Sequence, residues 1–447
     1  MSSHLGHHAI VIGGSIAGLL AARILADKFD QVTVVDRDRL PLTADPRRGV
    51  PQSVQPHVLF TKGYRILEEL FPGIGEALHD AGAISFDWTR DFRYFQRGDW
   101  SEILEAPSGL ESYTCTRPLL ESTIRQRVDR LPNVQFLEQQ RVVGLRGDRS
   151  RSCITGIELD HRGDLASKDL TAQLVVDASG RSTQAARWLQ ALGFTSPPAT
   201  VINPDVGYAT RRYRIPASAD PSYKILLISH QPPSRTRLGY LAAVENGEWI
   251  ATLGGYGQDY PPTDEPGFLE FAQSLPSPEF YNAICDAEPR SEMRVHRATA
   301  NRLYHYEQIE LPDGFVAIGD AVCALCPVYG QGMTVSAISS IVLRDWLVDR
   351  QKRRQQPSLN GASFQKRLAR SNALPWSLAT GFDSQFPTTK GAVSPKGIGK
   401  LFQGYANRLA ERAHNDPDLH LQFIEMAHLM KPPTILLSPR VMLKALF

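Results

Sequence analysis

Hydrophobic positions near the start of the chain change from one period to another. Residues 9–13 form an apolar run that ends in glycine, and residues 16–27 carry apolar side chains at helical spacing. Residues 31–35 (Gln-Val-Thr-Val-Val) alternate as in a half-buried strand. This order predicts a strand, a helix and a second strand, which together form a βαβ unit.

A long loop and two helices are expected next. Residues 41–56 are polar, contain Pro and Gly, and exceed an ordinary connection in length, so we expect them to contact a ligand. Apolar periodicity predicts helices over residues 59–70 and 118–130. Shorter strands are expected over residues 134–145 and 153–159, as a hairpin-like insert, and over residues 174–176, just before Asp177.

Two further blocks of alternating residues predict one antiparallel sheet built from insertions. Residues 86–100 alternate with many aromatic side chains, and strands in the second block are expected over 206–215, 224–229, 238–244 and 249–254. The aromatic residues of these blocks either line a pocket or fill the core of the sheet, and core filling is the default for any one of them. They are Phe92, Tyr94, Tyr208, Tyr213 and Tyr240.

Composition and charge narrow the class of protein. The chain has 447 residues, of which 42% are hydrophobic and 21% charged, as in a globular protein with more than one structural unit. Its net charge is +2 and it has no long basic run, so we expect no nucleic-acid partner. Five scattered cysteines suit a reducing cytoplasm. Cys323 and Cys326 have the spacing of a redox pair but lie inside a turn with another explanation, and we expect no metal site.

No segment predicts a membrane span. The first apolar run, residues 9–12, follows a polar start and stops at glycines, unlike a signal peptide, and no stretch approaches ~18 apolar residues. Residues 421–447 are rich in Leu, Ile, Met and Phe, with basic residues interspersed. We expect this tail to pack on its own domain, with a weak peripheral membrane contact as the alternative. A cytoplasmic location is therefore expected.

The turn at residues 13–18 (Gly-Gly-Ser-Ile-Ala-Gly) follows a strand and opens a helix. Gly13 permits the tight turn, Gly18 allows close packing of helix and strand, and the helix N-terminus offers N–H groups to a pyrophosphate. Ser15 replaces the middle glycine of the usual Gly-x-Gly-x-x-Gly pattern. Asp36 ends the second strand, where a carboxylate can accept hydrogen bonds from ribose hydroxyls and would repel the 2′-phosphate of NADP. The turn therefore predicts the adenine half of a dinucleotide site.

A second strand, turn and helix occur over residues 315–333. Asp320, at the exposed end of the strand, can accept hydrogen bonds from ribityl or ribose hydroxyls. Gly330 and Gly332 would let the backbone approach a flat ring, and a helix that begins near Met333 would direct its positive end toward the N1–C2=O edge of a flavin. NAD needs one such turn, whereas FAD must also have its ribityl chain and ring held, so the pair of turns predicts FAD.

Three segments carry a resemblance to a known family. Gly319-Asp-Ala321 with Pro327-x-x-Gly-Gln-Gly-Met333 resembles the Gly-Asp fingerprint of FAD-dependent monooxygenases of the p-hydroxybenzoate hydroxylase and squalene epoxidase type. Asp177-Ala-Ser-Gly-Arg-Ser182 stands where that family has its Asp-Gly motif. Arg117 matches the arginine that contacts FAD at the start of a helix. This resemblance covers roughly residues 8–345.

The loop before the first long helix narrows the resemblance. Arg48-Gly-Val-Pro-Gln52 with His57, together with residues 68–73, is similar to bacterial polyether-type (lasalocid-like) flavin epoxidases. The chain departs from the family at Gln55, where a histidine is expected, and at Cys326, where the similar proteins tend to have asparagine. The halogenase signature Trp-x-Trp-x-Ile-Pro is absent. Because Asp177 is followed by Ala-Ser, the reductant stays open between NADPH or NADH and a separate flavin reductase.

The resemblance implies an α/β protein with a doubly wound FAD-binding domain (Rossmann-like, glutathione-reductase type), an antiparallel β-sheet substrate domain and a helical C-terminal region. We expect the FAD domain to be discontinuous. The predicted bounds are 1–84, 101–200 and 292–350 for the FAD domain, 85–100 and 201–291 for the substrate domain, and 351–447 for the C-terminal region, with residues 355–361 at its boundary.

The implied activity is oxygen transfer from O2, through a C4a-hydroperoxyflavin, to a small apolar organic substrate, by alkene epoxidation or arene hydroxylation in secondary metabolism. Two alternatives stay open: an FAD oxidoreductase of the same fold without oxygen insertion (geranylgeranyl-reductase-like or a dehydrogenase), and a non-catalytic flavoprotein. The flavin is the expected oxidant, so His57 and Tyr329 are the only candidate catalytic residues. Candidate cofactor-binding residues are Gly13, Gly14, Ser15, Ala17, Gly18, Asp36, Arg37, Arg48, Arg117, Asp177, Gly319, Asp320, Pro327, Gly330, Gln331, Gly332 and Met333.

Overall fold

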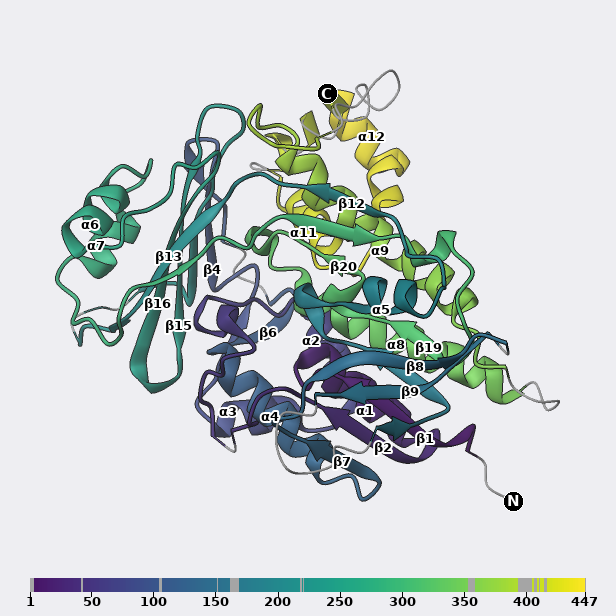
Figure 1. Ribbon diagram of the computed structural model, residues 1–447. Coiled ribbons are helices and arrows are strands. Elements are labelled where there is room, and N and C mark those ends of the chain that lie inside the picture. The colour runs from purple at the N-terminus through teal and green to yellow at the C-terminus, as the bar shows by residue number, and fades with distance from the viewer. Residues whose placement is uncertain are drawn as a thin grey trace.

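The computed structural model defines the fold over most of the chain (Figure 1). It describes residues 4–41, 43–103, 107–150, 152–160, 169–217, 219, 221–352, 358–392, 404–405, 408–409, 411–413 and 416–446. The expected boundary at residues 355–361 lies partly outside the described residues. Within them, every helix is too short or too polar to cross a bilayer.

A five-stranded parallel sheet forms the centre of the nucleotide-binding half. Its order is β19-β11-β1-β2-β7. The bounds of these strands are β1 (Gly6–Ile12), β2 (Phe29–Val35), β7 (Val134–Leu137), β11 (Leu174–Asp177) and β19 (Phe315–Ala317). Because four of the strands are apolar on both faces, the sheet is covered on both sides.

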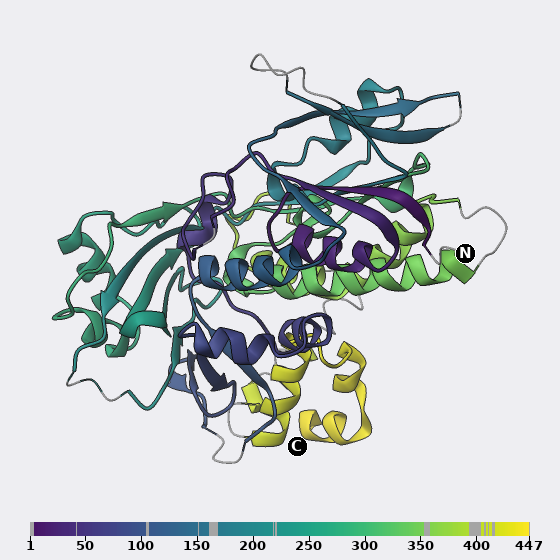
Figure 2. The same ribbon diagram turned by 90° about the horizontal axis from the view of Figure 1, so that it is seen from below.

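Helices cover one face of this sheet and a small antiparallel sheet lies on the other (Figure 2). α1 (Ile16–Ala26) packs against both α8 (Gly332–Lys352) and α4 (Arg117–Asp129). On the opposite side, β8 (Val142–Asp148), β9 (Cys153–Leu159) and β10 (Leu170–Thr171) pair in the order β10-β9-β8. The doubly wound FAD-domain fold predicted from the sequence is confirmed.

The expected hairpin-like insert over residues 134–145 is partly wrong. Residues 134–137 are β7, which pairs with β2 at the edge of the parallel sheet, and only β8 pairs with β9. The reason is that the polar stretch Glu-Gln-Gln-Arg at residues 138–141 separates two strands that belong to different sheets. Their apolar alternation alone does not distinguish the two partners.

A seven-stranded sheet draws its strands from two distant segments, as predicted. Its order is β17-β13-β16-β15-β14-β4-β5, and all neighbours are antiparallel except β4 and β14. α6 (Glu265–Gln273) and α7 (Glu279–Ile284) cover its outer face (Figure 1). The strand bounds are β4 (Phe92–Gln96), β5 (Asp99–Trp100), β13 (Gly207–Arg214), β14 (Ile225–Ile228), β15 (Arg237–Val244), β16 (Glu248–Gly255) and β17 (Arg294–His296).

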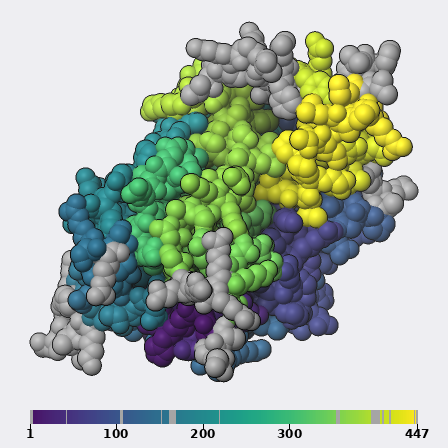
Figure 3. Space-filling model, turned by 90° about the vertical axis from the view of Figure 1, so that its right-hand side faces the viewer, coloured from purple at the N-terminus to yellow at the C-terminus, as the bar shows by residue number. Residues whose placement is uncertain are grey.

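The last helices form a block with its own apolar core (Figure 3). α9 (Ala362–Asp383) packs on α8, while α11 (Pro417–Ala427) and α12 (Pro439–Leu446) surround Leu419, Met426, Leu436 and Val441. The remaining elements connect these units. They are α2 (Thr61–Leu70), α3 (Ile74–Asp80), α5 (Ala185–Ala191), β3 (Ile84–Asp87), β6 (Glu111–Thr114), β12 (Ala199–Ile202), β18 (Asn301–Tyr304) and β20 (Cys323–Ala324).

Candidate active site

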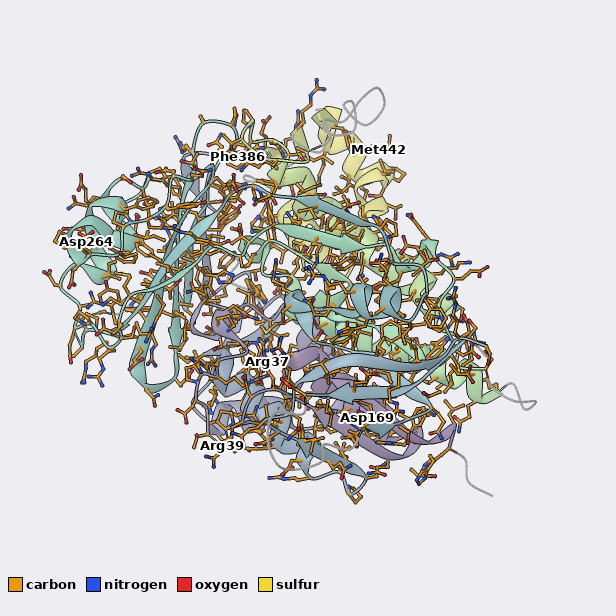
Figure 4. All side chains as sticks on the ribbon, viewed as in Figure 1. Arg37, Arg39, Asp169, Asp264, Phe386 and Met442 are labelled. Carbon is orange, nitrogen blue, oxygen red and sulfur yellow. The ribbon has the colours of Figure 1, made fainter. Side chains whose placement is uncertain are left out.

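One large cavity extends from the first glycine turn to the C-terminal helices. Its volume is about 1550 Å³, and both glycine turns, the loop at residues 47–60, the seven-stranded sheet, α9 and α11 contribute to its walls. Sites for single small molecules typically measure ~300–1,000 Å³. The volume therefore fits a site that takes a large cofactor and a second molecule together. In Figure 4, Arg37 lies near the middle of the molecule, and Phe386 lies close to the far end of the large sheet.

The two glycine turns touch each other at the same end of the parallel sheet. β1 and β19 both pair with β11, so their carboxyl ends align. Gly319 has a φ of +57°, and a Cβ atom on it would lie 2.8 Å from the Cβ of Ala17. Strand order thus makes one site from two turns that are far apart in the sequence.

The first turn leaves backbone N–H groups open toward the cavity. A Cβ atom on Gly18 would lie only 1.8 Å from the carbonyl oxygen of Gly13, so this position requires glycine. Ser15 caps α1 without a side-chain hydrogen bond to the helix. Ser15, Ile16 and Ala17 line the cavity. The start of α1 is therefore available to an anionic pyrophosphate, as the sequence predicts.

Glu121 joins the turn to two arginines. Its carboxylate accepts hydrogen bonds from Ser15 Oγ at 2.7 Å, from Arg47 Nε at 2.9 Å and from Arg117 Nη2 at 2.9 Å. Burial would raise the pKa of Glu121, but Arg117 and Arg47 outweigh it and hold the pKa below its ordinary value. Arg117 also donates to Ser15 Oγ at 2.9 Å, so the serine that replaces glycine has a structural role.

Asp36 lines the cavity but is also held by the protein. Its Oδ2 accepts from the Gly14 N–H at 2.7 Å, its Oδ1 accepts from the Asp38 N–H at 2.9 Å, and Arg47 Nη1 donates to both oxygens at 3.1 Å. Arg37 lines the cavity next to it (Figure 4). Arg47, rather than the expected Arg48, is the loop arginine at this site.

Five predicted cofactor-binding residues do not line the cavity. Gly14, Gly18 and Gly319 shape the turns from behind, and Arg48 is exposed on the outer side of its loop. Asp177 is fully buried, where its carboxylate accepts hydrogen bonds from Ser179 and Thr183. Burial raises the pKa of Asp177. Asp177 therefore supports the loop at residues 178–182, whose members line the cavity in its place.

The second turn presents a carboxylate and the start of α8. Asp320 lines the cavity with its side chain about one third exposed, and its Oδ2 lies 3.7 Å from Arg181 Nε. Burial raises the pKa of Asp320, and the neighbouring arginines, Arg181 first, oppose that rise. Gly330, with a φ of +63°, ends the turn. The other predicted members that line the cavity are Pro327, Tyr329, Gln331, Gly332 and Met333.

The donor set of this half matches the parts of FAD. The starts of α1 and α8 offer N–H groups, and Asp320 offers acceptors for hydroxyls. Arg117 Nη1 and Gln331 Oε1 are buried and have no hydrogen-bond partner within the described part of the chain. Such orphaned groups are uncommon in native proteins and point to a missing partner. The residues present therefore fit the cofactor that the sequence predicts.

The opposite half of the cavity has the inner face of the seven-stranded sheet as its floor. Pairing places Tyr94, Leu227, Tyr240 and Thr252 in one row across β4, β14, β15 and β16, and all four line the cavity. Phe92 and Tyr208 also line it. Tyr213 has the opposite orientation and packs with the core under α6 and α7. The aromatic alternation thus serves both a pocket and a core.

Within this row Tyr240 has the only hydroxyl without a partner among the described residues. Tyr94 bonds to Ser229, and Thr252 Oγ1 lies 2.6 Å from Thr210 Oγ1. Tyr240 makes no hydrogen bond, and burial raises the pKa of its phenol. A buried tyrosine hydroxyl usually has a partner. The geometry leaves Tyr240 free to bond to a molecule in the cavity.

Rings and aliphatic side chains form the walls around this floor. These side chains come from the residue before α2, from the segment after β3, and from α9 and α11. They are Phe60, Trp88, Leu378, Phe382, Phe423 and Ile424. We call this half, together with the floor row, the substrate chamber. Two of its histidines, His230 and His428, are neutral, because burial lowers the pKa of each to about 3. Arg97 is paired with Glu411 at 2.9 Å.

His57 lies between the two halves of the cavity. Its Nδ1 is 3.0 Å from the carbonyl oxygen of Gln55. Burial, and then the charge of Arg117, lower the pKa of His57 to about 3, so the ring is neutral at physiological pH. Tyr329 faces the cavity from the second turn and donates its hydroxyl to Asp383. The structure thus brings both candidate catalytic residues to the cavity.

The cysteines show no redox arrangement in the described residues. Cys323 and Cys326 are buried and unpaired, and burial raises the pKa of both thiols, which disfavours the reactive thiolate. Nowhere in the described ranges do three or more His, Cys, Asp or Glu side chains gather as metal ligands do.

Several functional residues were not found from the sequence. Arg47, Glu121, Arg181, Asn301 and Asp383 contribute charges or hydrogen bonds at the turns. Three of them had a local signal: Glu121 lies four residues after Arg117 on the same helix face, Arg47 lies in the long loop at residues 41–56, and Arg181 lies in the motif at residues 177–182. The others come from segments whose approach depends on the tertiary fold.

Several solved structures have the same architecture as this chain. A flavoprotein/dehydrogenase from Cytophaga hutchinsonii superposes with a TM-score of 0.68 at 16% identity, over 99% of this chain and 98% of that chain. The flavin-dependent brominase Bmp2 gives 0.66 at 14% identity, over 95% and 93%. PqsL, a probable FAD-dependent monooxygenase from Pseudomonas aeruginosa, gives 0.61 at 15% identity, over 85% and 94%. At such identities the likeness shows the fold, which is that of FAD-dependent monooxygenases and halogenases.

Sequence comparison identifies a nearer relative. No family model matches the chain. Protein Rv3254 of Mycobacterium tuberculosis (strain ATCC 25618 / H37Rv) is 33% identical over 346 residues, which cover 75% of this chain and 72% of that protein. The similarity to polyether-type epoxidases stays a prediction. The chain belongs to the family of Protein Rv3254.

Proposed function

We propose that this protein is an FAD-dependent monooxygenase that transfers one oxygen atom from O2 to an apolar organic substrate. The observation that carries the proposal is the large cavity that joins both glycine turns to the mostly apolar substrate chamber. The first turn and Arg117 would hold the pyrophosphate, and Asp320 with the start of α8 would hold the ribityl chain and the ring. NADPH, NADH or a separate flavin reductase would supply electrons.

When it is bound and reduced, FAD would react with O2 and provide the oxidant. The protein's own contribution is to bind, orient and exclude water. Apolar residues such as Trp88, Phe92 and Phe423 keep water away from the reacting groups. Tyr240 orients the substrate by a hydrogen bond, because its hydroxyl has no protein partner in the described residues.

The lining of the substrate chamber favours epoxidation of an alkene over hydroxylation of a phenol. A phenol needs a base close to its hydroxyl group. The carboxylates that line the cavity, Asp36 and Asp320, belong to the cofactor half, and burial keeps His230 and His428 neutral with weakly basic rings. A substrate that reacts without losing a proton to the protein fits this lining best.

The decisive experiment follows oxygen and product together. The purified protein is loaded with FAD, supplied with NADPH or NADH, with and without a flavin reductase, and incubated with a panel of neutral alkenes and arenes. We expect O2 uptake to be coupled to an oxygenated product that carries label from 18O2. Substrate oxidation or reduction under anaerobic conditions, without labelled product, would instead support an FAD oxidoreductase of the same fold. A protein that binds no FAD would contradict both.

A further inference from the structure

Asp383 lies at the end of α9 and accepts hydrogen bonds from three side chains. Its Oδ1 accepts from Tyr329 Oη at 2.5 Å and from Tyr256 Oη at 3.3 Å. Its Oδ2 accepts from Asn301 Nδ2 at 2.5 Å. Asp383 itself has no exposed surface. A residue of the C-terminal helices thus contacts side chains from the segment just after β16, from β18 and from the second turn.

These contacts hold a short segment of the second turn, residues 326–330, near both of its ends. Asn301 Oδ1 accepts a hydrogen bond from the backbone N–H of Cys326 at 2.7 Å, just before Pro327. Tyr329, at the other end, bonds directly to Asp383. The residues between them form a short 3-10 helix (Pro327–Tyr329) that lines the cavity. Asp383 and Asn301 therefore fix the segment at residues 326–330, which we call the flavin turn.

Burying the Asp383 carboxylate at this position is energetically unfavourable, which suggests a functional reason for it. Burial raises its pKa to about 6, and no basic side chain forms an ion pair with it among the described residues. It is also the last residue of α9, where the negative end of the helix dipole disfavours a carboxylate. Sequences depart from local preferences most often at functional sites. The three donors to this carboxylate all contact the flavin turn: Tyr329 belongs to it, Asn301 bonds to Cys326, and Tyr256 lies 3.3 Å from the Tyr329 hydroxyl.

We propose that Asp383, acting through Tyr329 and Asn301, is a positioning residue that holds the flavin turn in the conformation that binds FAD. This inference rests on the proposed function, because it assumes that the turn receives the flavin. It also gives the C-terminal helices a part in cofactor binding, in addition to their place in the chamber wall.

The direction of the hydrogen bonds supplies a specific test. In D383N the new amide either sets its NH2 group against the Asn301 NH2 group, donor against donor, or flips and sets it against the Tyr329 hydroxyl, which then loses its acceptor. A flip of Asn301 would instead place its NH2 group against the Cys326 N–H. In N301D two carboxylates would face each other. In the double variant D383N/N301D the amide introduced at position 383 donates to the carboxylate introduced at position 301. That carboxylate still accepts from the Cys326 N–H, so the connection is restored.

The experiment measures FAD affinity by fluorescence quenching and thermal melting without FAD, for wild type, both single variants and the double variant. We expect each single variant to bind FAD about 10-fold more weakly, and the double variant to recover most of that loss. D205N is the matched control: Asp205 binds Lys390 and Asn203, makes no contact with the flavin turn, and should leave FAD affinity unchanged.

Three outcomes would overturn the proposal. A folded D383N that binds FAD like the wild type removes the role of Asp383, and so does a folded double variant without any recovery. If D383N does not fold, Y329F replaces it, because this variant keeps the ring and loses only the hydroxyl; wild-type FAD affinity in Y329F then overturns the proposal. A wild-type protein that binds no FAD contradicts the proposed function itself.

Discussion

The two ends of the cavity differ in how they hold their side chains. At the end formed by the first turn, which we propose holds the adenosine part of FAD and call the adenosine end, Asp36 and Glu121 are bound to Arg47 and Arg117 through buried, charge-assisted hydrogen bonds. At the substrate chamber, aromatic rings, hydroxyls and neutral histidines form the lining, and Arg97 is already paired. A site for one invariant ligand benefits from fixed charges, because that ligand always needs the same arrangement of charged groups. An apolar chamber binds its ligand mainly by shape and lacks the specificity that fixed charges provide.

The largest effect is expected where the adenosine end tolerates no added atom. Gly18→Ala places a Cβ atom 1.8 Å from the Gly13 carbonyl oxygen, so the first turn must open. We expect FAD affinity to fall by at least about 100-fold, with a loss of stability of about 3 kcal/mol or more. The same change at the substrate chamber, Gly381→Ala, meets no atom within 4 Å. Titration with FAD and urea unfolding compare the two, and equal effects would contradict the distinction.

The next effect concerns the charges behind the first turn. Glu121→Gln leaves the buried Arg117 without an ion-pair partner among the described residues, whereas Arg47 keeps Asp36 and Asp38. Because breaking a buried pair leaves an uncompensated charge, we expect the free energy of unfolding to fall by about 3–5 kcal/mol. Glu69→Gln, which breaks the exposed pair with Arg344, should cost less than about 1 kcal/mol. Urea unfolding of both variants tests this, and a loss in E121Q as small as in E69Q would show that the buried network is dispensable.

A smaller effect is expected at the second turn. Asp320→Ala removes the partly exposed carboxylate that faces the cavity. We expect the dissociation constant for FAD to rise about 10–100-fold, since a hydrogen bond to a charged group contributes about 1.5–3 kcal/mol. Asp345→Ala removes an exposed carboxylate from α8, the helix that follows the second turn, and is the control. Unchanged flavin retention after gel filtration of D320A would refute the role assigned to Asp320.

The smallest effect should appear in the substrate chamber. Tyr240→Phe removes one hydroxyl and keeps the ring, so we expect KM for the substrate to rise about 3–10-fold, with FAD affinity unchanged. Tyr213→Phe makes the same change on the opposite face of the sheet, in the core under α6 and α7, and should leave KM as it is. Steady-state kinetics of both variants decide whether the free hydroxyl of Tyr240 contacts the substrate.

The parts of the site that the sequence predicted are those that depend on local patterns. The first turn with Asp36 and the second turn with Asp320 follow from strand and helix boundaries, whereas Arg117 was implied by the resemblance, and all three line the cavity. The sequence named Arg48 and not Arg47, although Arg47 lines the cavity and Arg48 is exposed, and this has a physical reason. Both lie in an irregular loop, where no periodicity tells which side chain points inward.

Long-range contacts mark the limit of sequence reasoning. Asn301 and Asp383 are 82 residues apart, and neither belongs to a motif. Their contact depends on how α9 packs beside the second turn, which neither local propensity nor hydrophobic pattern specifies. The assignment of residues 134–137 failed similarly, because an apolar strand of four residues fits a hairpin or a sheet edge equally well. The sheet built from two insertions was predicted because three of its strands are long, with eight residues each.

The separate core of the C-terminal helices has an evolutionary consequence. Leu419, Met426, Leu436 and Val441 pack with one another rather than with the core of the parallel sheet, while their neighbours Phe423 and Ile424 face the chamber. Substitutions in α11 can therefore reshape the chamber without disturbing the nucleotide-binding core. Homologous enzymes with different substrates should diverge fastest in this segment, and exchanging it between them is a direct route to altered selectivity.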